Sequence, residues 1–226
     1  MTGNEVCDIL VARGVTHLHH ANSVKTSLSQ LQVGGLASRA LIEASRLPQT
    51  NQITDTEDRE YGIWGDVFVD TVDIHRRISN RNMYGPVLFV LNVNVLRALP
   101  PTARVLVTRS NPTKWKETKT DAERYFLTTA ELNSGLSVGD FDQMLVIKTA
   151  EGIVPFAQYL ENIVLDEPKV MIGTSPEFDE AATALAGAVV GLGLQVAVSR
   201  RSCAPCNCIR SYGEKASRIP WFFGVQ

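Results

Sequence analysis

Aromatic residues, cysteines and net charge are all scarce in this chain of 226 residues. A formal net charge of −2 excludes a strongly basic nucleic-acid coat protein, so any nucleic-acid site must be a local patch. Long hydrophobic runs are missing too, because the longest, residues 181–194, is too short to span a bilayer. Residues 1–10 carry acids where an export signal needs bases. We therefore expect a cytoplasmic protein that makes no contact with a membrane.

The four cysteines do not resemble the framework of a secreted disulfide protein, since three of them cluster near one end. Cys203, Cys206 and Cys208 would supply three thiolates of a zinc site, whose fourth ligand would have to come from a distant residue. The sequence contains no second pair with this spacing. Reduced thiols are therefore expected here, with no metal, and zinc is the secondary alternative.

The residues that are plentiful describe a folded domain, since apolar residues make up 44% of the chain and charged residues 20%. Runs rich in β-branched residues predict strands at 15–19, 63–74, 86–95, 103–108, 144–149, 169–173 and 195–199. Apolar spacing and capping residues predict helices at 4–13, 23–31, 38–46, 156–162 and 175–192, and residues 49–60 read as a polar loop. Because helices and strands do not alternate strictly, the sequence predicts an α+β fold.

Three of the four histidines, His17, His19 and His20, lie within four residues of each other. On a strand, His17 and His19 would face one side and His20 the other, which disfavours a common metal. The chain also lacks the HExxH spacing of zinc proteases. Surface or hydrogen-bonded histidines are one interpretation of this segment, and a resemblance to a known family is the other.

The order of His17, Asn22, an amphipathic helix and the turn Gly34-Gly35-Leu36-Ala37-Ser38-Arg39 resembles the N-terminal part of DarT-type ADP-ribosyltransferases. The resemblance extends over residues 15–165 and implies a split β-sheet core with flanking helices in residues 1–167. Residues 168–226 would form a C-terminal α/β extension, either a separate module or a completion of the same domain. Thr16 stands where the family has a tyrosine.

This resemblance implies that NAD is the substrate and that His17 hydrogen-bonds its ribose. Asn22 belongs to the same implied NAD-binding set. An arginine would pair with the pyrophosphate, either Arg59 or Arg39. An aromatic side chain, Phe68 or Tyr61, would stack on the nicotinamide. The alternative for the middle segment is a charged, solvated loop, and a metal held by its acids is disfavoured because EF-hand spacing is absent.

The family also carries a catalytic glutamate at or just before an apolar strand, and Gln143 occupies that place in the segment 141–147. An anion is needed there because positive charge develops on the sugar as nicotinamide leaves. Two explanations stay open beside an ordinary role at the strand edge. Gln143 is a Glu→Gln change that impairs catalysis, or it is natural and the enzyme is inactive or uses another acid such as Asp140 or Asp142.

A basic segment, residues 109–119, lies between two predicted strands. Lys114, Lys116 and Lys119 suit phosphates, and Trp115 suits stacking on an unpaired base. These four residues are the predicted nucleic-acid contacts, and plain surface is the alternative. The basic, aromatic tail after residue 200 is a further candidate for docking nucleic acid or protein, or for packing onto its own domain.

The leading hypothesis is therefore an NAD-dependent mono-ADP-ribosyltransferase toxin that modifies a base of RNA or single-stranded DNA. The resemblance further implies a toxin–antitoxin pair tied to phage defence, with a neutralising antitoxin as partner. Two alternatives remain: a catalytically inactive module that binds nucleic acid or nucleotides, and a zinc-stabilised interaction protein.

Overall fold

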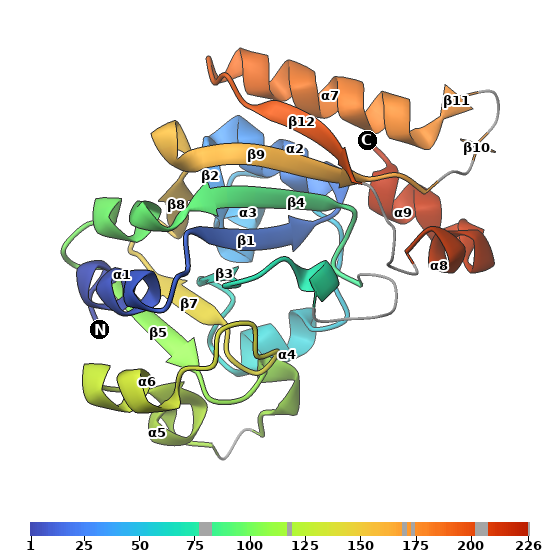
Figure 1. The fold of residues 1–226 in the computed structure, drawn as a ribbon. Coiled ribbons are helices and arrows are strands. Elements are labelled where there is room, and N and C mark those ends of the chain that lie inside the picture. Colours follow the sequence, from blue (N-terminus) through green and yellow to red (C-terminus); the bar gives the residue numbers. More distant parts are fainter. Residues whose placement is uncertain (77–82, 117–118, 169–170, 173–174, 202–207, 226) are drawn as a thin grey trace.

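The computed structural model describes residues 1–76, 83–116, 119–168, 171–172, 175–201 and 208–225, and it mixes helices with strands as the α+β prediction requires (Figure 1). The described helices are α1 (Gly3–Ala12), α2 (Val24–Val33), α3 (Arg39–Ala44), α4 (Asp55–Glu60), α5 (Asp121–Arg124), α6 (Thr129–Gly135), α7 (Glu177–Gly191), α8 (Cys208–Glu214) and α9 (Ile219–Phe223). Among the described residues, no helix combines the length and apolar character that a bilayer crossing needs.

Two larger sheets form the frame of the molecule. The first runs in the order β1 (His17–Asn22), β4 (Val87–Asn92), β9 (Leu160–Asp166) and β12 (Ala197–Arg201). The second runs in the order β3 (Val67–Val69), β7 (Leu145–Lys148), β5 (Arg104–Thr108) and β6 (Tyr125–Phe126). All pairings are antiparallel except that of β9 with β12, which is parallel. Two short pairs complete the strands, β2 (Gly35–Ala37) with β8 (Ile153–Pro155) and β10 (Met171–Ile172) with β11 (Ser175–Pro176).

The two sheets meet where β1 passes β3. The backbone N–H of His19 donates to the Asp70 carbonyl at 2.9 Å, and the Asp70 N–H donates back to His19 at 2.8 Å. This isolated antiparallel bridge ties the first sheet to the second. Figure 1 shows the first sheet above and the second below, with the N-terminal helix α1 beside them. The join fixes side chains from both sheets around one region.

The C-terminal segment shares the core of the rest of the chain. Phe178, Leu185 and Val189 of α7 belong to the same buried cluster as Leu18 of β1 and Phe89 of β4. Helix α7 packs on α2, and Figure 1 shows it crossing the top of the first sheet. Residues 175–201 therefore add a strand and a covering helix to the first sheet.

Most of the predicted elements that the structure describes are present, but two are wrong. Residues 156–162 were expected to be helical, yet a short 3-10 turn gives way to β9 at Leu160. The β-branched and apolar residues of β9 pair with β4 along a register that propensity alone does not reveal. Residues 49–60, expected to be loop, contain α4 with acids in its first turn.

A buried charge network fastens the C-terminal segment to the loop after β3. Arg201 of β12 donates from Nε to Asp166 at 2.6 Å and pairs with Asp73. His75 lies 3.1 Å from each of the same two carboxylates, and the Tyr212 hydroxyl donates to Asp166 at 3.0 Å. Burial by itself would lower the pKa of His75, but its hydrogen bonds to Asp166 and Asp73 outweigh burial and raise the pKa to about 9.

This network predicts that folding stability falls as the solution becomes alkaline. The pKa of His75 is raised from its ordinary 6.5 to about 9, so its contribution is complete below about pH 6.5 and is lost as pH rises through about 9. We expect the free energy of unfolding to drop by on the order of 2–3 kcal/mol across this window. Urea titrations at several pH values test this. His75→Gln should remove the slope, and His17→Gln, a half-buried surface histidine, should leave it in place.

Candidate functional site

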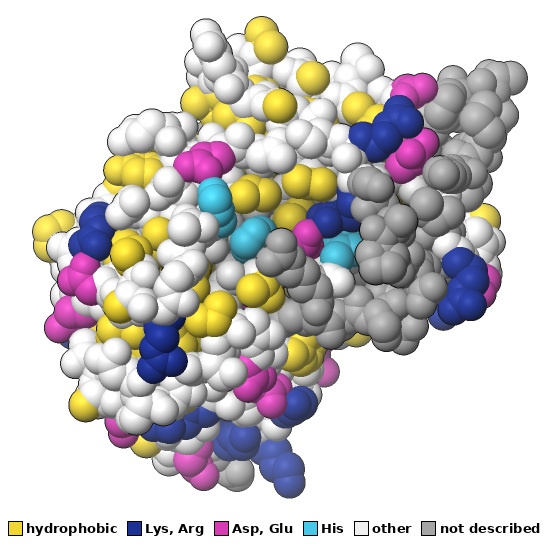
Figure 2. All heavy atoms as spheres, in the orientation of Figure 1, with side chains coloured by type: hydrophobic (Ala, Val, Ile, Leu, Met, Phe, Trp, Pro, Cys, Tyr) yellow, Lys and Arg dark blue, Asp and Glu magenta, His cyan; other side chains and the backbone are white. Residues whose placement is uncertain are grey.

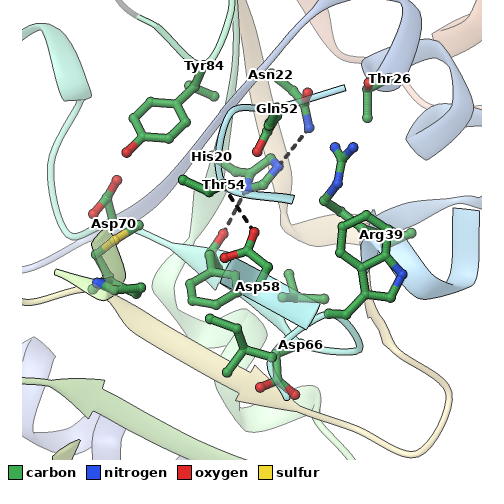
Figure 3. A pocket seen from close by; sticks show the side chains of 18 of the residues that line it. His20, Asn22, Thr26, Arg39, Gln52, Thr54, Asp58, Asp66, Asp70 and Tyr84 are labelled. Carbon is green, nitrogen blue, oxygen red and sulfur yellow. Dashed lines mark hydrogen bonds between the residues drawn. The ribbon is translucent and has the colours of Figure 1, made fainter. Parts of the chain in front are cut away.

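A cavity of about 120 Å³ lies at the junction of the two sheets. Figure 3 shows its labelled side chains converging from β1, α2, α3, the segment 49–58 and the start of the second sheet. Its polar lining residues include His20, Asn22, Thr26, Gln30, Arg39, Gln52, Thr54, Asp58, Asp66, Asp70 and Tyr84. Phe68 and Trp64 add aromatic surface. The cavity thus brings amide, cationic, acidic and aromatic groups together in one place.

Local sequence signals place these side chains. Ser23 caps α2, its hydroxyl accepting from the Thr26 N–H, and Gly34 ends the helix in the left-handed conformation at φ 80°. Ser38 caps α3 in the same way and brings Arg39 to the first helical position. Gly85 has φ 142°, and a Cβ there would lie 2.2 Å from the Asn22 backbone. Only glycine permits this approach, which holds Tyr84 beside Asn22.

His20 organises two amides on the cavity wall. Its Nδ1–H donates to the Phe68 carbonyl at 2.7 Å, so Nε2 is left to accept. The amide nitrogens of Asn22 and Gln30 each lie 3.3 Å from Nε2. Desolvation lowers the pKa of His20, which keeps the ring neutral at physiological pH. Gln30 is 1% exposed, and within the described part of the chain its Oε1 has no hydrogen-bond partner, so this oxygen can accept from a ligand.

The guanidinium of Arg39 uses only some of its hydrogen-bond donors within the protein. Its Nη2 donates to Asp55 at 2.8 Å and to the Thr50 carbonyl at 3.1 Å. Its Nε and Nη1 are buried and have no hydrogen-bond partner among the described residues. The guanidinium also lies over the Trp64 ring, 5.0 Å from the centroid. Two orphaned donors on a cation at a cavity wall match an anionic ligand with paired oxygens.

Asp58 is the acid of the cavity that no described cation pairs with. Among the described residues, the hydroxyl of Thr54 donates a hydrogen bond to its carboxylate at 3.2 Å. Burial raises its pKa from 3.8 to about 6. Asp66, by contrast, is held by Lys148 at 2.6 Å. At neutral pH Asp58 therefore presents a carboxylate whose charge is poorly compensated by the protein.

The structure brings some of the predicted NAD contacts together and separates others. Asn22, Arg39 and Phe68 line the cavity. His17 is not among the lining residues, although His19 and His20 are, and its Nε2 lies 2.7 Å from Glu161. Arg59 lies outside the lining as well, and makes two 3.0 Å bonds to Glu43 with its guanidinium over Trp64. His20 and Arg39, rather than His17 and Arg59, are the residues that the fold points inward.

Gln143 is not among the residues that line the cavity. It is 9% exposed, and both ends of its amide are taken by the backbone after α6. Its Nε2 donates to the Gly135 carbonyl at 2.9 Å, and its Oε1 accepts from the Ser137 N–H at 2.7 Å. A glutamate would set a carboxylate against the Gly135 carbonyl. Both bonds need an amide, which has a donor and an acceptor. The geometry therefore supports a structural role for Gln143 and not the catalytic role that the family resemblance implies for this position.

Gln143→Glu is consequently expected to destabilise the fold by about 1–3 kcal/mol, because one buried carbonyl loses its donor and faces an anion. It should not raise any NAD-dependent activity above that of the wild type. Thermal unfolding and nicotinamide release measure the two effects. Gln32→Glu, on the exposed face of α2, is the matched control. A glutamate variant that is as stable as the wild type and gains activity would reinstate position 143 as the catalytic site.

The predicted basic contact segment is mostly occupied by intramolecular bonds. Trp115 is 5% exposed and packs with Tyr61 and Tyr125, so in this structure its ring is not open for stacking on a base. Lys114 pairs with Asp142 at 2.7 Å, and Lys119 donates to Ser110 at 3.4 Å. Lys116 is exposed. Charged side chains of both signs are interspersed over the face seen in Figure 2, with no broad basic surface there.

The alternative of a zinc site was predicted at Cys203, Cys206 and Cys208. Cys203 and Cys206 lie outside the described residues, and of Cys208 only the backbone at the start of α8 is described. Within the described part of the chain, no group of three or more histidine, cysteine or acidic side chains is arranged to hold a metal.

Sequence reasoning did not single out Gln30, Asp58 and Tyr84, which also line the cavity. Gln30 could be recognised only from the packing of α2, because that packing decides which face of the helix lies toward β1. Asp58 stood among several acids with nothing to separate it, and burial without a cation partner is what distinguishes it. For Tyr84, the adjoining Gly85 was the one available signal.

No family model matches the sequence, and no curated protein matches it. A similar solved structure is that of Thermus sp. 2.9 DarT in complex with ADP-ribosylated ssDNA. The TM-score is 0.49 at 11% sequence identity, and the match covers 82% of this chain and 94% of that chain. A similarity this weak supports no conclusion about function.

Proposed function

We propose that this protein is an NAD-dependent mono-ADP-ribosyltransferase, with the two sheets forming its split core and the cavity at their junction binding NAD. The observation that carries the proposal is Arg39, a half-buried cation whose Nε and Nη1 have no described partner, on a wall shared with amides, aromatic rings and an acid. The NAD pyrophosphate is an anion with adjacent oxygens, which suits such a guanidinium. The resemblance carried by the segment from His17 to Arg39 supports the same assignment.

The nicotinamide end of NAD is assigned to the cavity itself, which at about 120 Å³ is sized for one end of a dinucleotide. A carboxamide offers two donors and one acceptor. The Oε1 of Gln30 requires a donor, and Asn22 and neutral His20 supply polar contacts beside it. Phe68 and Trp64 provide apolar faces for the ring. In this assignment His20, rather than His17, is the histidine that organises the site.

The reaction breaks the bond between the ribose anomeric carbon and the nicotinamide nitrogen, and the bonding electron pair leaves with nicotinamide. Positive charge then builds on the ribose, and an anion held nearby lowers the energy of that state. We assign this role to Asp58, because its carboxylate faces the cavity without a paired cation. The acceptor then forms the new bond to the anomeric carbon and loses a proton.

We further propose that the acceptor is a base of single-stranded DNA or of RNA. A cytoplasmic toxin of this kind would need a neutralising antitoxin as partner, and phage defence is the proposed setting. A transfer assay with NAD labelled in its adenylate half tests the proposal, offering single-stranded DNA, RNA and total protein to the purified chain. Label on a nucleic acid supports it. Label on protein overturns the acceptor, and NAD bound without transfer favours an inactive nucleotide-binding module. A chain that does not bind NAD overturns the proposal altogether.

A further inference from the structure

A second cavity, of about 300 Å³, opens beside the first and shares part of its wall. Asn22, Gln52, Thr54, Tyr84 and Thr113 line both cavities. A group bound in the second cavity would therefore lie next to the ligand in the first. Its volume is at the lower end of the range typical of small-ligand pockets.

The far wall of the second cavity comes from α9, near the C-terminus. Trp221 is 55% exposed and lines the cavity, whereas its neighbours Phe222 and Phe223 are 5% and 1% exposed. Phe223 packs edge-on against Tyr212, with ring centroids 5.5 Å apart. The buried phenylalanines thus hold the helix in place, while the indole of Trp221 stays exposed to solvent. A fixed, exposed aromatic face over a cavity is a platform on which a planar ring can stack.

The rim beside Trp221 carries positive charge that the protein does not neutralise. Arg200, Arg201 and Arg210 of the same C-terminal segment each pair with an acid. Arg218, which lines the cavity, and Lys215 are exposed and form no ion pair with any described acid. Arg218, a cation without a described acid partner, lines the same cavity as the exposed Trp221. This pair matches a nucleotide, whose base stacks on an aromatic ring and whose phosphate needs a cation.

We propose that the second cavity binds an unpaired base of a single-stranded nucleic acid, stacked on Trp221 with its phosphate toward Arg218. This inference rests on the proposed function, since it makes the second cavity the acceptor site of the transferase. The alternative occupant is the adenosine half of NAD. An open rim favours the strand: Ile53 and Met83, on the same cavity, are 83% and 44% exposed, and a polymer must continue in both directions past the bound base.

The test is fluorescence anisotropy with a fluorescein-labelled single-stranded oligonucleotide of mixed sequence, in DNA and RNA form, and the duplex for comparison. Trp221→Ala should weaken single-strand binding by about 5- to 150-fold, the effect of losing one base–aromatic stack. Trp221→Phe should recover most of the affinity because it keeps an aromatic face. Val190→Ala, at an apolar side chain on α7 that is 74% exposed, should leave the affinity unchanged. Arg218→Gln should reduce the slope of log affinity against log salt by about 0.7.

The outcomes separate this inference from the proposed function. If Trp221→Ala weakens NAD binding in calorimetry and leaves the oligonucleotide unaffected, the second cavity holds adenosine and the acceptor assignment is overturned. The inference is also overturned if the wild-type protein does not bind single strands. It is overturned as well if a folded Trp221→Ala variant binds them as tightly as the wild type. If single strands bind through Trp221 but NAD does not bind at all, the strand site stands and the transferase proposal falls.

Discussion

Asp58→Asn is expected to slow the release of nicotinamide from NAD by about 10²- to 10³-fold, the usual effect of removing one preorganised charge from a transition state. Asparagine keeps the shape of the side chain and still accepts from the Thr54 hydroxyl, now 3.2 Å from the carboxylate. Only the charge that opposes the developing ribose cation is lost. Nicotinamide release at saturating NAD measures the rate, at about pH 8, where a carboxyl of pKa about 6 is ionised.

The same substitution should stabilise the fold. Burial raises the pKa of Asp58 from 3.8 to about 6, so the folded state keeps the proton longer and stability falls as pH rises between these values. At neutral pH the ionised carboxylate therefore costs at most about 3 kcal/mol, and less after solvent screening of a partly exposed group. Glu57→Gln, an exposed neighbour on α4, is the control for loss of a charge. A wild-type rate in Asp58→Asn would contradict the role assigned to this acid.

Arg39→Lys is expected to weaken NAD binding by about 10²-fold, because two charge-assisted hydrogen bonds from the guanidinium fork cannot be replaced by one ammonium. Lysine retains a positive charge beside Asp55, whose carboxylate accepts from Arg39 at 2.8 Å, so the local fold should survive. Isothermal titration with NAD and with nicotinamide mononucleotide gives the affinities. The affinity for the mononucleotide, which lacks the pyrophosphate, should fall much less than the affinity for NAD.

Arg59→Lys is the matched control for this experiment. Arg59 also contacts Trp64, with its guanidinium 3.7 Å from the ring centroid, but it donates its hydrogen bonds to Glu43 at the surface. Its replacement should leave NAD affinity within about twofold of the wild type, since exposed ion pairs contribute little. Equal losses in the two variants would show that the arginines act through Trp64 and not through the pyrophosphate.

The strands were predictable where the side chains were buried on both faces. Residues 86–95 and 103–108 read as strands because they are β-branched and apolar, and β4 and β5 lie inside these ranges. Helix α7, predicted at 175–192, begins and ends within two residues of its expected bounds. The strand β9 was missed because its pairing with β4 and β12 depends on chain segments more than 30 residues away.

The site was predictable only as far as local motifs reach. Asn22 and Arg39 were named through the family resemblance of the segment from His17 to Arg39, and both line the cavity. The choice between His17 and His20 depended on which face of β1 meets the second sheet, which sequence alone does not reveal. Trp115 reads as an exposed stacking residue from its lysine neighbours, yet Tyr61 and Tyr125 enclose it. The platform of Trp221 depends on the docking of α9, far along the chain from the first cavity.

The most direct test of the central claim is a crystal structure of Asp58→Asn grown with NAD, in which slow turnover keeps the dinucleotide intact. The account predicts nicotinamide in the cavity at the junction of the two sheets, its carboxamide bonded to Gln30, and the pyrophosphate on Nε and Nη1 of Arg39. NAD bound elsewhere, or an Arg39 that keeps both donors unpaired beside bound NAD, would contradict it.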